Sequence, residues 1–150
     1  MTRHPIALAV VALLLAPLGA AAELPKDVQH GLETAKYVYI ASTRKDGSLG
    51  APAEIWFMWH DGAVYVGTRP TSWRVRRIKA GRPQARIAVG AADGPAFTAT
   101  GSLVQDAKIE ALMLETFAKK YPDRWADHAE NFRNGFKDGS RVIVKYVPKS

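Results

Sequence analysis

A dense cluster of positive charge is the part of this sequence most able to do chemistry. In residues 67–82, GTRPTSWRVRRIKAGR, six of sixteen residues are arginine or lysine, and the cluster directly follows a strand-like run. Such a cluster could hold a phosphate at the start of a helix, contact a nucleic acid, or form a solvated helix face. The rest of the chain has to separate these three alternatives.

The second half of that cluster has the pattern of a short helix over residues 71–80. Its apolar positions fall three apart, Thr71 or Ser72 can cap the first free amides, and a glycine follows in the closing position. Free amides at a helix start carry partial positive charge, and Arg74 would add charge-assisted hydrogen bonds to an anion. Arg77, three residues further on, falls on the same face. The pattern favours a phosphate site, with a solvated helix face as the alternative.

No other set of residues has the spacing of a catalytic or metal-binding motif. The chain has no cysteine, no nucleophile elbow, no phosphate loop and no dinucleotide fingerprint. His30, His60 and His128 lack ligand spacing, and each is expected at the surface. We therefore expect no catalytic side chain and no metal site.

Two further features could contribute to a ligand site. The four tryptophans are flat enough to sandwich a ring, although aromatic residues in a small barrel more often belong to the core or an interface. Glu54 is the one acidic residue in an otherwise apolar strand. If it is buried, it needs a partner such as Arg74 or Arg86, and a structural ion pair is the expected result.

These residues must be positioned mainly by strands. Alternating apolar residues and β-branched or aromatic side chains predict six strands, over residues 36–43, 50–59, 63–68, 84–91, 96–104 and 141–148. Helical spacing predicts helices over residues 26–34, 71–80, 106–121 and 125–136. Asp-Gly turns join the first three strands into an antiparallel meander. The sequence therefore predicts a mainly β (α+β) protein, a six-stranded antiparallel barrel with helices at its flank.

The first 22 residues have the pattern of an export signal. Arg3 supplies a basic start, residues 6–18 an apolar run, and three alanines ending at Ala22 a cleavage site. The apolar run is shorter than the roughly 20 residues that cross a bilayer, and the chain has no cysteine for a lipid anchor. We expect a signal peptide over residues 1–22, one domain over residues 23–150, and a periplasmic or secreted protein with no stable membrane anchor. An exported protein rarely meets nucleic acid, so we expect no nucleic-acid partner; the net charge of +7 attracts anions but does not select one.

Three stretches, taken in order, resemble the FMN-binding split barrel of the pyridoxamine 5'-phosphate oxidase-like superfamily. They are YIASTRKDGSLGAPAEIWFMWHDGAVYVGT, then SWRVRRI followed by RPQARIAV, and finally RVIVKYVP. The resemblance covers about residues 36–148. It implies a homodimer with FMN at its interface and a flavin-dependent oxidoreductase of unknown substrate.

The resemblance also implies which residues hold the flavin. In that superfamily a threonine at the end of the third strand and a Ser-x-Lys/Arg at the next helix hold the phosphate, while the second strand supports the isoalloxazine. Here the candidate cofactor-binding residues are Glu54, Ile55, Trp56, Gly67, Thr68, Ser72, Trp73, Arg74 and Arg77.

The chain departs from the oxidase at both ends of the second-strand stretch. Pro52 and Phe57 stand where the oxidase places basic residues, and the sequence ends at Ser150 without the segment that binds the vitamer. We therefore do not expect a true pyridoxamine 5'-phosphate oxidase. The alternative is a non-catalytic binding module for another anionic planar ligand, haem or a deazaflavin.

Overall fold

The computed structural model of the protein describes residues 23–149, so the export signal expected at residues 1–22 lies outside the described residues. The strands are β1 (Val38–Ser42), β2 (Ala53–Ile55), β3 (Met58–His60), β4 (Ala63–Thr68), β5 (Gln84–Val89), β6 (Ala96–Val104) and β7 (Val142–Pro148). The helices are α1 (Lys26–Thr34), α2 (Trp73–Lys79), α3 (Ala107–Lys120) and α4 (Pro122–Asp138).

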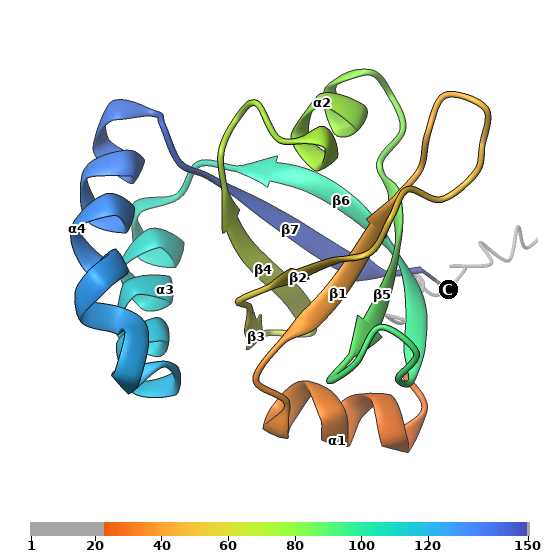
Figure 1. The fold of residues 1–150 in the computed structure, drawn as a ribbon, viewed down its shortest axis with the longest axis horizontal. Helices are drawn as coiled ribbons and strands as arrows, with labels where there is room; N and C mark the ends of the chain where they lie inside the picture. The colour runs from red at the N-terminus through yellow and green to blue at the C-terminus, as the bar shows by residue number, and fades with distance from the viewer. Residues whose placement is uncertain (1–22, 150) are drawn as a thin grey trace, which may run out of the picture.

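All seven strands belong to one curled antiparallel sheet, in the order β2-β1-β5-β6-β7-β4-β3 (Figure 1). The two edge strands, β2 and β3, are consecutive in the chain and are separated only by Trp56 and Phe57. One segment therefore serves both edges of the sheet and brings them together. This confirms the predicted antiparallel α+β split barrel with flanking helices.

The predicted single strand over residues 50–59 is wrong, because it is two strands, and the sheet has seven strands instead of six. The segment pairs with β1 on one side and with β4 on the other, so it must leave one ladder before it enters the next. At the break, the backbone N–H of Phe57 donates to the Tyr121 hydroxyl at 3.0 Å. Its carbonyl accepts from Lys120 Nζ at 3.0 Å. The corner between α3 and α4 thus satisfies the backbone groups that the sheet releases.

Both pairs of the predicted meander are confirmed, although the strand that they share is broken. β1 pairs with β2, and β3 pairs with β4 across a turn at Asp61 and Gly62, whose φ angles of 47° and 71° are left-handed. Such a turn matches the twist of the two strands it joins. The last strand, β7, lies inside the sheet between β6 and β4.

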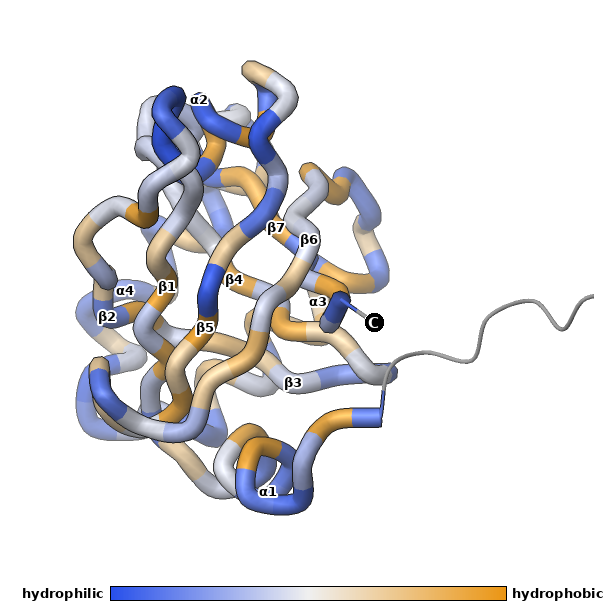
Figure 2. The backbone as a smooth tube through the Cα atoms, turned by 90° about the vertical axis from the view of Figure 1, so that its right-hand side faces the viewer, coloured by the Kyte–Doolittle hydropathy of each residue, from blue (hydrophilic) through white to orange (hydrophobic). Residues whose placement is uncertain are grey.

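The core has two parts, one on each side of this sheet. Inside the barrel, strand residues such as Val38, Val66 and Ile87 pack with Val28 and Leu32 of the amphipathic helix α1, which closes one end (Figure 1). Figure 2 shows hydrophobic segments along the strands and a largely hydrophilic α2. A second cluster lies between the sheet and the α3–α4 pair and contains Met58, Tyr65, Met113, Phe117, Tyr121, Phe132 and Ile143.

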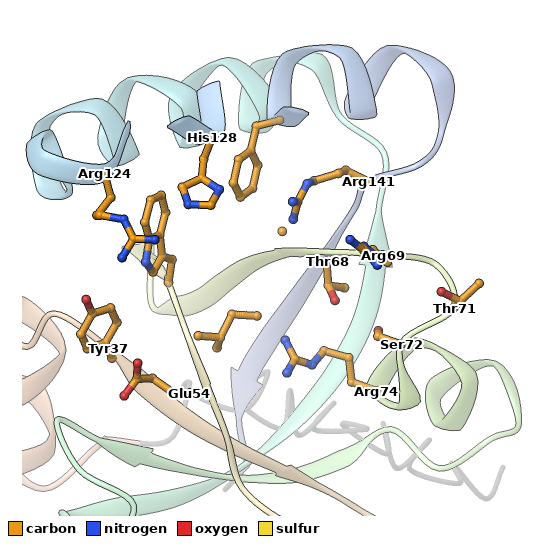
Figure 3. Close-up of a pocket in the computed structure, with 14 residues that line it drawn as sticks. Tyr37, Glu54, Thr68, Arg69, Thr71, Ser72, Arg74, Arg124, His128 and Arg141 are labelled. Carbon is orange, nitrogen blue, oxygen red and sulfur yellow. The ribbon is translucent and has the colours of Figure 1, made fainter. Parts of the chain in front are cut away.

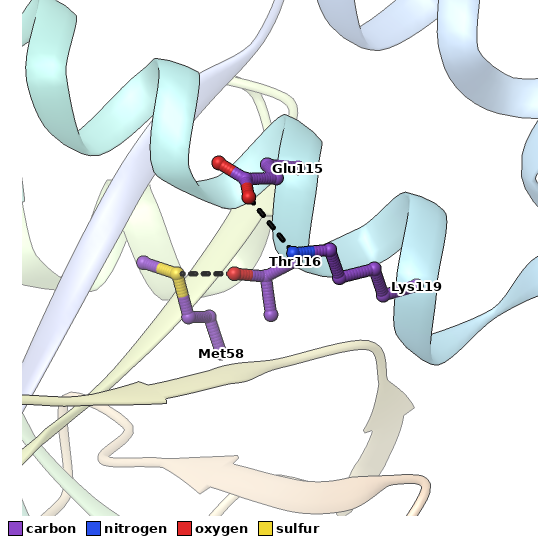
Figure 4. Close-up of polar contacts among 4 residues, drawn as sticks. All are labelled: Met58, Glu115, Thr116 and Lys119. Atoms are coloured by element: carbon purple, nitrogen blue, oxygen red, sulfur yellow. Dashed lines mark hydrogen bonds and ion pairs between the residues drawn. The ribbon is translucent and has the colours of Figure 1, made fainter.

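Helix α3 is attached to the strand β3 through this second cluster. The Thr116 hydroxyl donates to Met58 Sδ at 3.4 Å, and the exposed pair Lys119–Glu115 joins at 2.8 Å on the helix surface (Figure 4). An exposed i,i+4 pair contributes only about 0.3–0.5 kcal/mol. Apolar packing therefore holds the helix in place.

Two glycines allow α4 to dock closely against the strand ends. A β-carbon at Gly67 would lie 2.6 Å from Cε1 of Phe132, and one at Gly135 would lie 2.5 Å from Cγ of Arg141. Only glycine leaves room for both approaches. As a result one face of α4 overlooks the end of β4. Within residues 23–149, every helix is too short or too polar to cross a membrane.

Candidate cofactor-binding site

A cleft of about 520 Å³ lies where β2, the end of β4, the start of α2 and α4 meet (Figure 3). This volume is within the range of small-molecule sites, roughly 300–1,000 Å³. Seven of the nine residues expected from the sequence line the cleft: Glu54, Ile55, Trp56, Gly67, Thr68, Ser72 and Arg74. Residues that are up to twenty positions apart in the chain therefore meet at one cavity.

At one end of the cleft, Ser72 and Arg74 have buried polar atoms without partners. The Ser72 hydroxyl and Arg74 Nη1 are shielded from solvent, and neither makes a hydrogen bond within the described residues. Burial lowers the pKa of the Arg74 guanidinium below its usual value, because the charged form is desolvated. A buried cation without a counter-charge is costly. An anion in the cleft would supply the missing partner to both groups.

The Ser72 hydroxyl is free because it does not cap α2. Ser72 occupies the N-cap position with extended backbone angles, but no side-chain capping hydrogen bond forms there. The predicted cap is therefore wrong for Ser72, and Thr71 lines the cleft instead. With only seven residues, α2 has a small dipole, so the anion-binding character of this end comes from side chains.

Tyr146 lies behind Arg74 and adds a second buried hydroxyl without a partner in residues 23–149. Burial raises the pKa of this phenol to about 12, and the charge of Arg74 acts in the opposite direction. The tyrosine is therefore neutral at physiological pH and cannot serve as the counter-charge of Arg74.

Trp73 and Arg77, the other two residues that the sequence assigned to the cofactor site, do not line the cleft. Trp73 is 66% exposed, and the guanidinium groups of Arg76 and Arg77 stack over its ring, each at 5.3 Å. Arg77 Nη1 donates to the hydroxyl and the carbonyl of Ser42, at 2.7 and 3.1 Å. The i,i+4 contact with Trp73 turns Arg77 toward β1, where it fixes α2 to the sheet.

Glu54 also differs from its expected role as a buried ion pair. It is exposed at the rim of the cleft, and the Tyr39 hydroxyl donates to its carboxylate. The pKa of Tyr39 rises because of this hydrogen bond. Glu54 therefore leaves Arg74 without a carboxylate partner.

The cleft contains residues that sequence reasoning did not assign to it, chiefly from α4. Arg124, His128 and Phe132 recur every four residues on this helix, so they share the face that overlooks β4 (Figure 3). His128 was expected at the surface, yet it is half-buried and packs edge-on against Trp56, at 5.1 Å between ring centroids. The four-residue spacing was the available signal.

Aromatic rings form one wall of the cleft. The rings of Trp56 and Tyr121 stack, with 4.1 Å between their centroids and an interplanar angle of 10°. The ring of Phe132 lies 6.3 Å from that of Trp56, at an interplanar angle of 5°. Tyr37, which also lines the cleft, stacks on Tyr121 at 6.2 Å between ring centroids. This set of nearly parallel rings suits contact with a flat ligand.

The charge of the cleft is strongly positive. Four arginines line it, at positions 69, 74, 124 and 141, together with the single carboxylate of Glu54. The ion pair Lys119–Glu115 is the only one within residues 23–149, so none of these arginines is neutralised by an acidic side chain there. The same part of the chain holds no group of three or more histidine or acidic residues that could bind a metal ion. The cleft is therefore suited to an anionic, flat molecule.

No family model matches the chain, and the search of curated proteins returns no match. Solved structures do share its fold. A putative pyridoxamine 5'-phosphate oxidase from Listeria innocua is 16% identical, with a TM-score of 0.58 over 82% of this chain and 91% of that one. HutZ, the haem storage protein of Vibrio cholerae, is 13% identical, with a TM-score of 0.59 over 86% and 92%. An F420 reductase is 21% identical, with a TM-score of 0.54 over 85% and 97%. At these identities the similarity establishes a shared fold.

Proposed function

We propose that this chain, which has the split-barrel fold of the pyridoxamine 5'-phosphate oxidase-like proteins, binds FMN in the cleft beside α2. The observation that carries the proposal is the pair of buried polar atoms without partners, Ser72 Oγ and Arg74 Nη1. Both point to an anionic group, and both lie at the end of a cleft with an aromatic wall. A phosphate attached to a flat ring system has this combination of properties.

Each part of the cleft has a role in this proposal. Ser72 and Arg74 hold the phosphate, with Thr68 beside them at the end of β4. Ile55 at the end of β2 and Trp56 in the break that follows it support the ring, and their backbone and side chains exclude water from one side. When bound, the flavin itself supplies the electron or hydride chemistry, which requires no acid or base from the protein. The function proposed is therefore that of a flavin-dependent oxidoreductase.

Arginine substitutions on α2 test the proposal, because two of its arginines are placed differently. Arg74→Ala should weaken FMN binding at least tenfold, since a charge-assisted hydrogen bond contributes about 1.5–3 kcal/mol. Arg76→Ala is the matched control, because Arg76 is exposed and stacks on Trp73 outside the cleft. Titration monitored by flavin fluorescence gives both affinities.

Riboflavin, which lacks the phosphate, separates the phosphate contact from general damage. Its affinity should be equal in the wild type and in Arg74→Ala. If Arg74→Ala and Arg76→Ala bind FMN as the wild type does, the phosphate does not lie at this end of the cleft. A wild-type protein that ignores FMN altogether would refute the proposal.

Haem is the second candidate ligand, and His128 is the observation that favours it. Its imidazole lines the same cleft, and arginines on both sides could pair with propionate groups. A Soret band on addition of haem, lost in His128→Ala, would select this alternative over flavin. A deazaflavin would need the same phosphate contacts as FMN and would be recognised by its own absorption spectrum.

We also propose that the protein is exported and acts as a homodimer. The support for export is the pattern of residues 1–22, and N-terminal sequencing of mature protein should begin at Glu23. The support for the dimer is the family resemblance of the sequence. Light scattering of the purified domain would measure its mass directly.

A further inference from the structure

The cleft continues past Thr68 into a second, smaller hollow. This hollow, of about 380 Å³, is lined by Arg69, Pro70, Thr71, Asn131, Ser140 and Arg141. Arg69, Thr71 and Arg141 line both cavities, whereas Ser72 and Arg74 line only the first. The labelled side chains of Figure 3 show Arg141 and Arg74 on opposite sides of Thr68.

The fold places Arg69 directly opposite Arg141. Thr68, the last residue of β4, pairs with Val142, the first residue of β7, so the residues just outside this pair face each other across the two strands. Like charges opposite each other on neighbouring strands destabilise a sheet. No acidic side chain forms an ion pair with either arginine in the described part of the chain. The repulsion between Arg69 and Arg141 would be relieved by an anion that binds between them.

Electrostatics separates this pair of arginines from Arg74. Burial and then the charge of Arg69 lower the pKa of Arg141 below its usual value. For Arg74, burial lowers the pKa and Tyr146 acts in the opposite direction. The positive charge of the cleft is therefore divided between two places.

The guanidinium of Arg141 is held in position by its surroundings. Its backbone N–H donates to the carbonyl of Gly135 at 3.0 Å, and its side chain passes close over that glycine. The guanidinium lies 4.2 Å from the centroid of the Phe132 ring, in a cation–π contact. It is thus fixed beside the hollow before any ligand arrives. Thr71, Asn131 and Ser140 add neutral hydrogen-bond donors, as phosphate oxygens require.

We infer that Arg69 and Arg141 form a second anion-binding subsite, separate from Ser72 and Arg74, that takes a second phosphate-like group. The inference deepens the proposed function, because it makes the ligand of the cleft a pair of oxyanions in place of one. The second group belongs either to the cofactor itself, as in a flavin with a diphosphate, or to a separate anionic substrate.

Inorganic phosphate is the probe that tests the subsite without relying on flavin. In Arg74→Ala the first subsite is disabled, and phosphate should still shift the guanidinium NMR signals of Arg69 and Arg141. Adding Arg141→Gln should weaken this binding at least tenfold. Arg133→Gln is the matched control, because Arg133 is an exposed arginine of α4 near Trp125. No phosphate binding in Arg74→Ala, or equal losses with the two glutamine variants, would overturn the inference.

Flavin affinities then identify the source of the second anion. They also distinguish a failure of the second subsite from a failure of the proposed flavin binding. FAD binding tighter than FMN binding, with the advantage lost in Arg141→Gln, assigns the second group to the cofactor. Phosphate binding to the FMN-loaded wild type, also lost in Arg141→Gln, assigns it to a separate ligand. If Arg141→Gln weakens FMN as much as Arg74→Ala does, one phosphate contacts both arginines, and the second subsite is refuted. A protein that binds phosphate at Arg141 but no flavin would refute only the proposed function.

Discussion

Tyr121→Phe tests how the α3–α4 corner holds the broken edge strand. The Tyr121 hydroxyl accepts from the Phe57 backbone N–H at 3.0 Å and donates to the Lys36 carbonyl at 2.8 Å, and the residue is 1% exposed. It therefore links the β2–β3 break to the chain entering β1. Phenylalanine keeps the ring and its stacking on Trp56 but removes the oxygen.

The expected loss follows from these two hydrogen bonds. The bond to Lys36 contributes about 1 kcal/mol, and the buried amide of Phe57, left without an acceptor, costs about 1–3 kcal/mol. We therefore expect the free energy of unfolding to fall by about 2–4 kcal/mol. For a domain of this size that corresponds to a decrease in melting temperature of roughly 8 °C.

Urea unfolding measures the free energy of unfolding of Tyr121→Phe and of the control variant Tyr65→Phe. Tyr65 is also buried, at 4% exposure, but its hydroxyl makes no hydrogen bond within residues 23–149. Removal of the Tyr65 hydroxyl should change the free energy of unfolding by less than about 0.5 kcal/mol. Equal effects of the two substitutions would show that the Tyr121 hydroxyl does not support the strand break.

Two further changes examine the docking of the helices. A β-carbon at Gly67 would lie 2.6 Å from Phe132 Cε1, so Gly67→Ala should displace α4 and weaken FMN binding. Urea unfolding should show a loss of about 1–3 kcal/mol in the free energy of unfolding. Unchanged stability would mean that the Phe132 ring turns aside. Burial lowers the pKa of Lys120 from 10.5 to about 8, so between these values the unfolded chain binds more protons and the stability due to Lys120 rises with pH. The difference in unfolding free energy between the wild type and Lys120→Met should therefore increase from about pH 8 to about pH 10. A difference that stays the same over this range would contradict this reasoning.

Local patterns in the sequence predicted most of the elements correctly. The strand β6, over Ala96–Val104, has the predicted bounds, and the helices differ from their predicted ranges by three residues or fewer at each end. Turn residues and alternating side chains depend only on neighbours in the chain, so they can be read from the sequence directly. The full order in which the strands pair, with β7 between β6 and β4, was not predicted and is given by the structure.

The errors arose where a contact distant in the chain overrides a local pattern. Nothing near Trp56 and Phe57 indicates a break, because the groups that satisfy it come from Lys120 and Tyr121. The spacing of Arg77 and Arg74 predicted that both would reach the ligand, but Arg77 bonds to Ser42 of the distant strand β1 instead.

The α4 half of the cleft was missed for the same reason. The docking of this helix depends on small residues at Gly67 and Gly135, and the sequence alone does not say which helix will use the space they leave. Only the regular spacing of Arg124, His128 and Phe132 marks the face that carries the site.

The central place of β7 also has a consequence for how the chain acquires its fold during synthesis. The last strand supplies the hydrogen-bonding partners of both β6 and β4, which are otherwise not joined to each other. A nascent polypeptide that emerges N-terminus first can form only two separate pieces of sheet, β2-β1-β5-β6 and β4-β3, until β7 leaves the ribosome. Unpaired strand edges would then remain accessible to holding chaperones for the whole of translation, and removal of β7 should leave two fragments of sheet that cannot assemble.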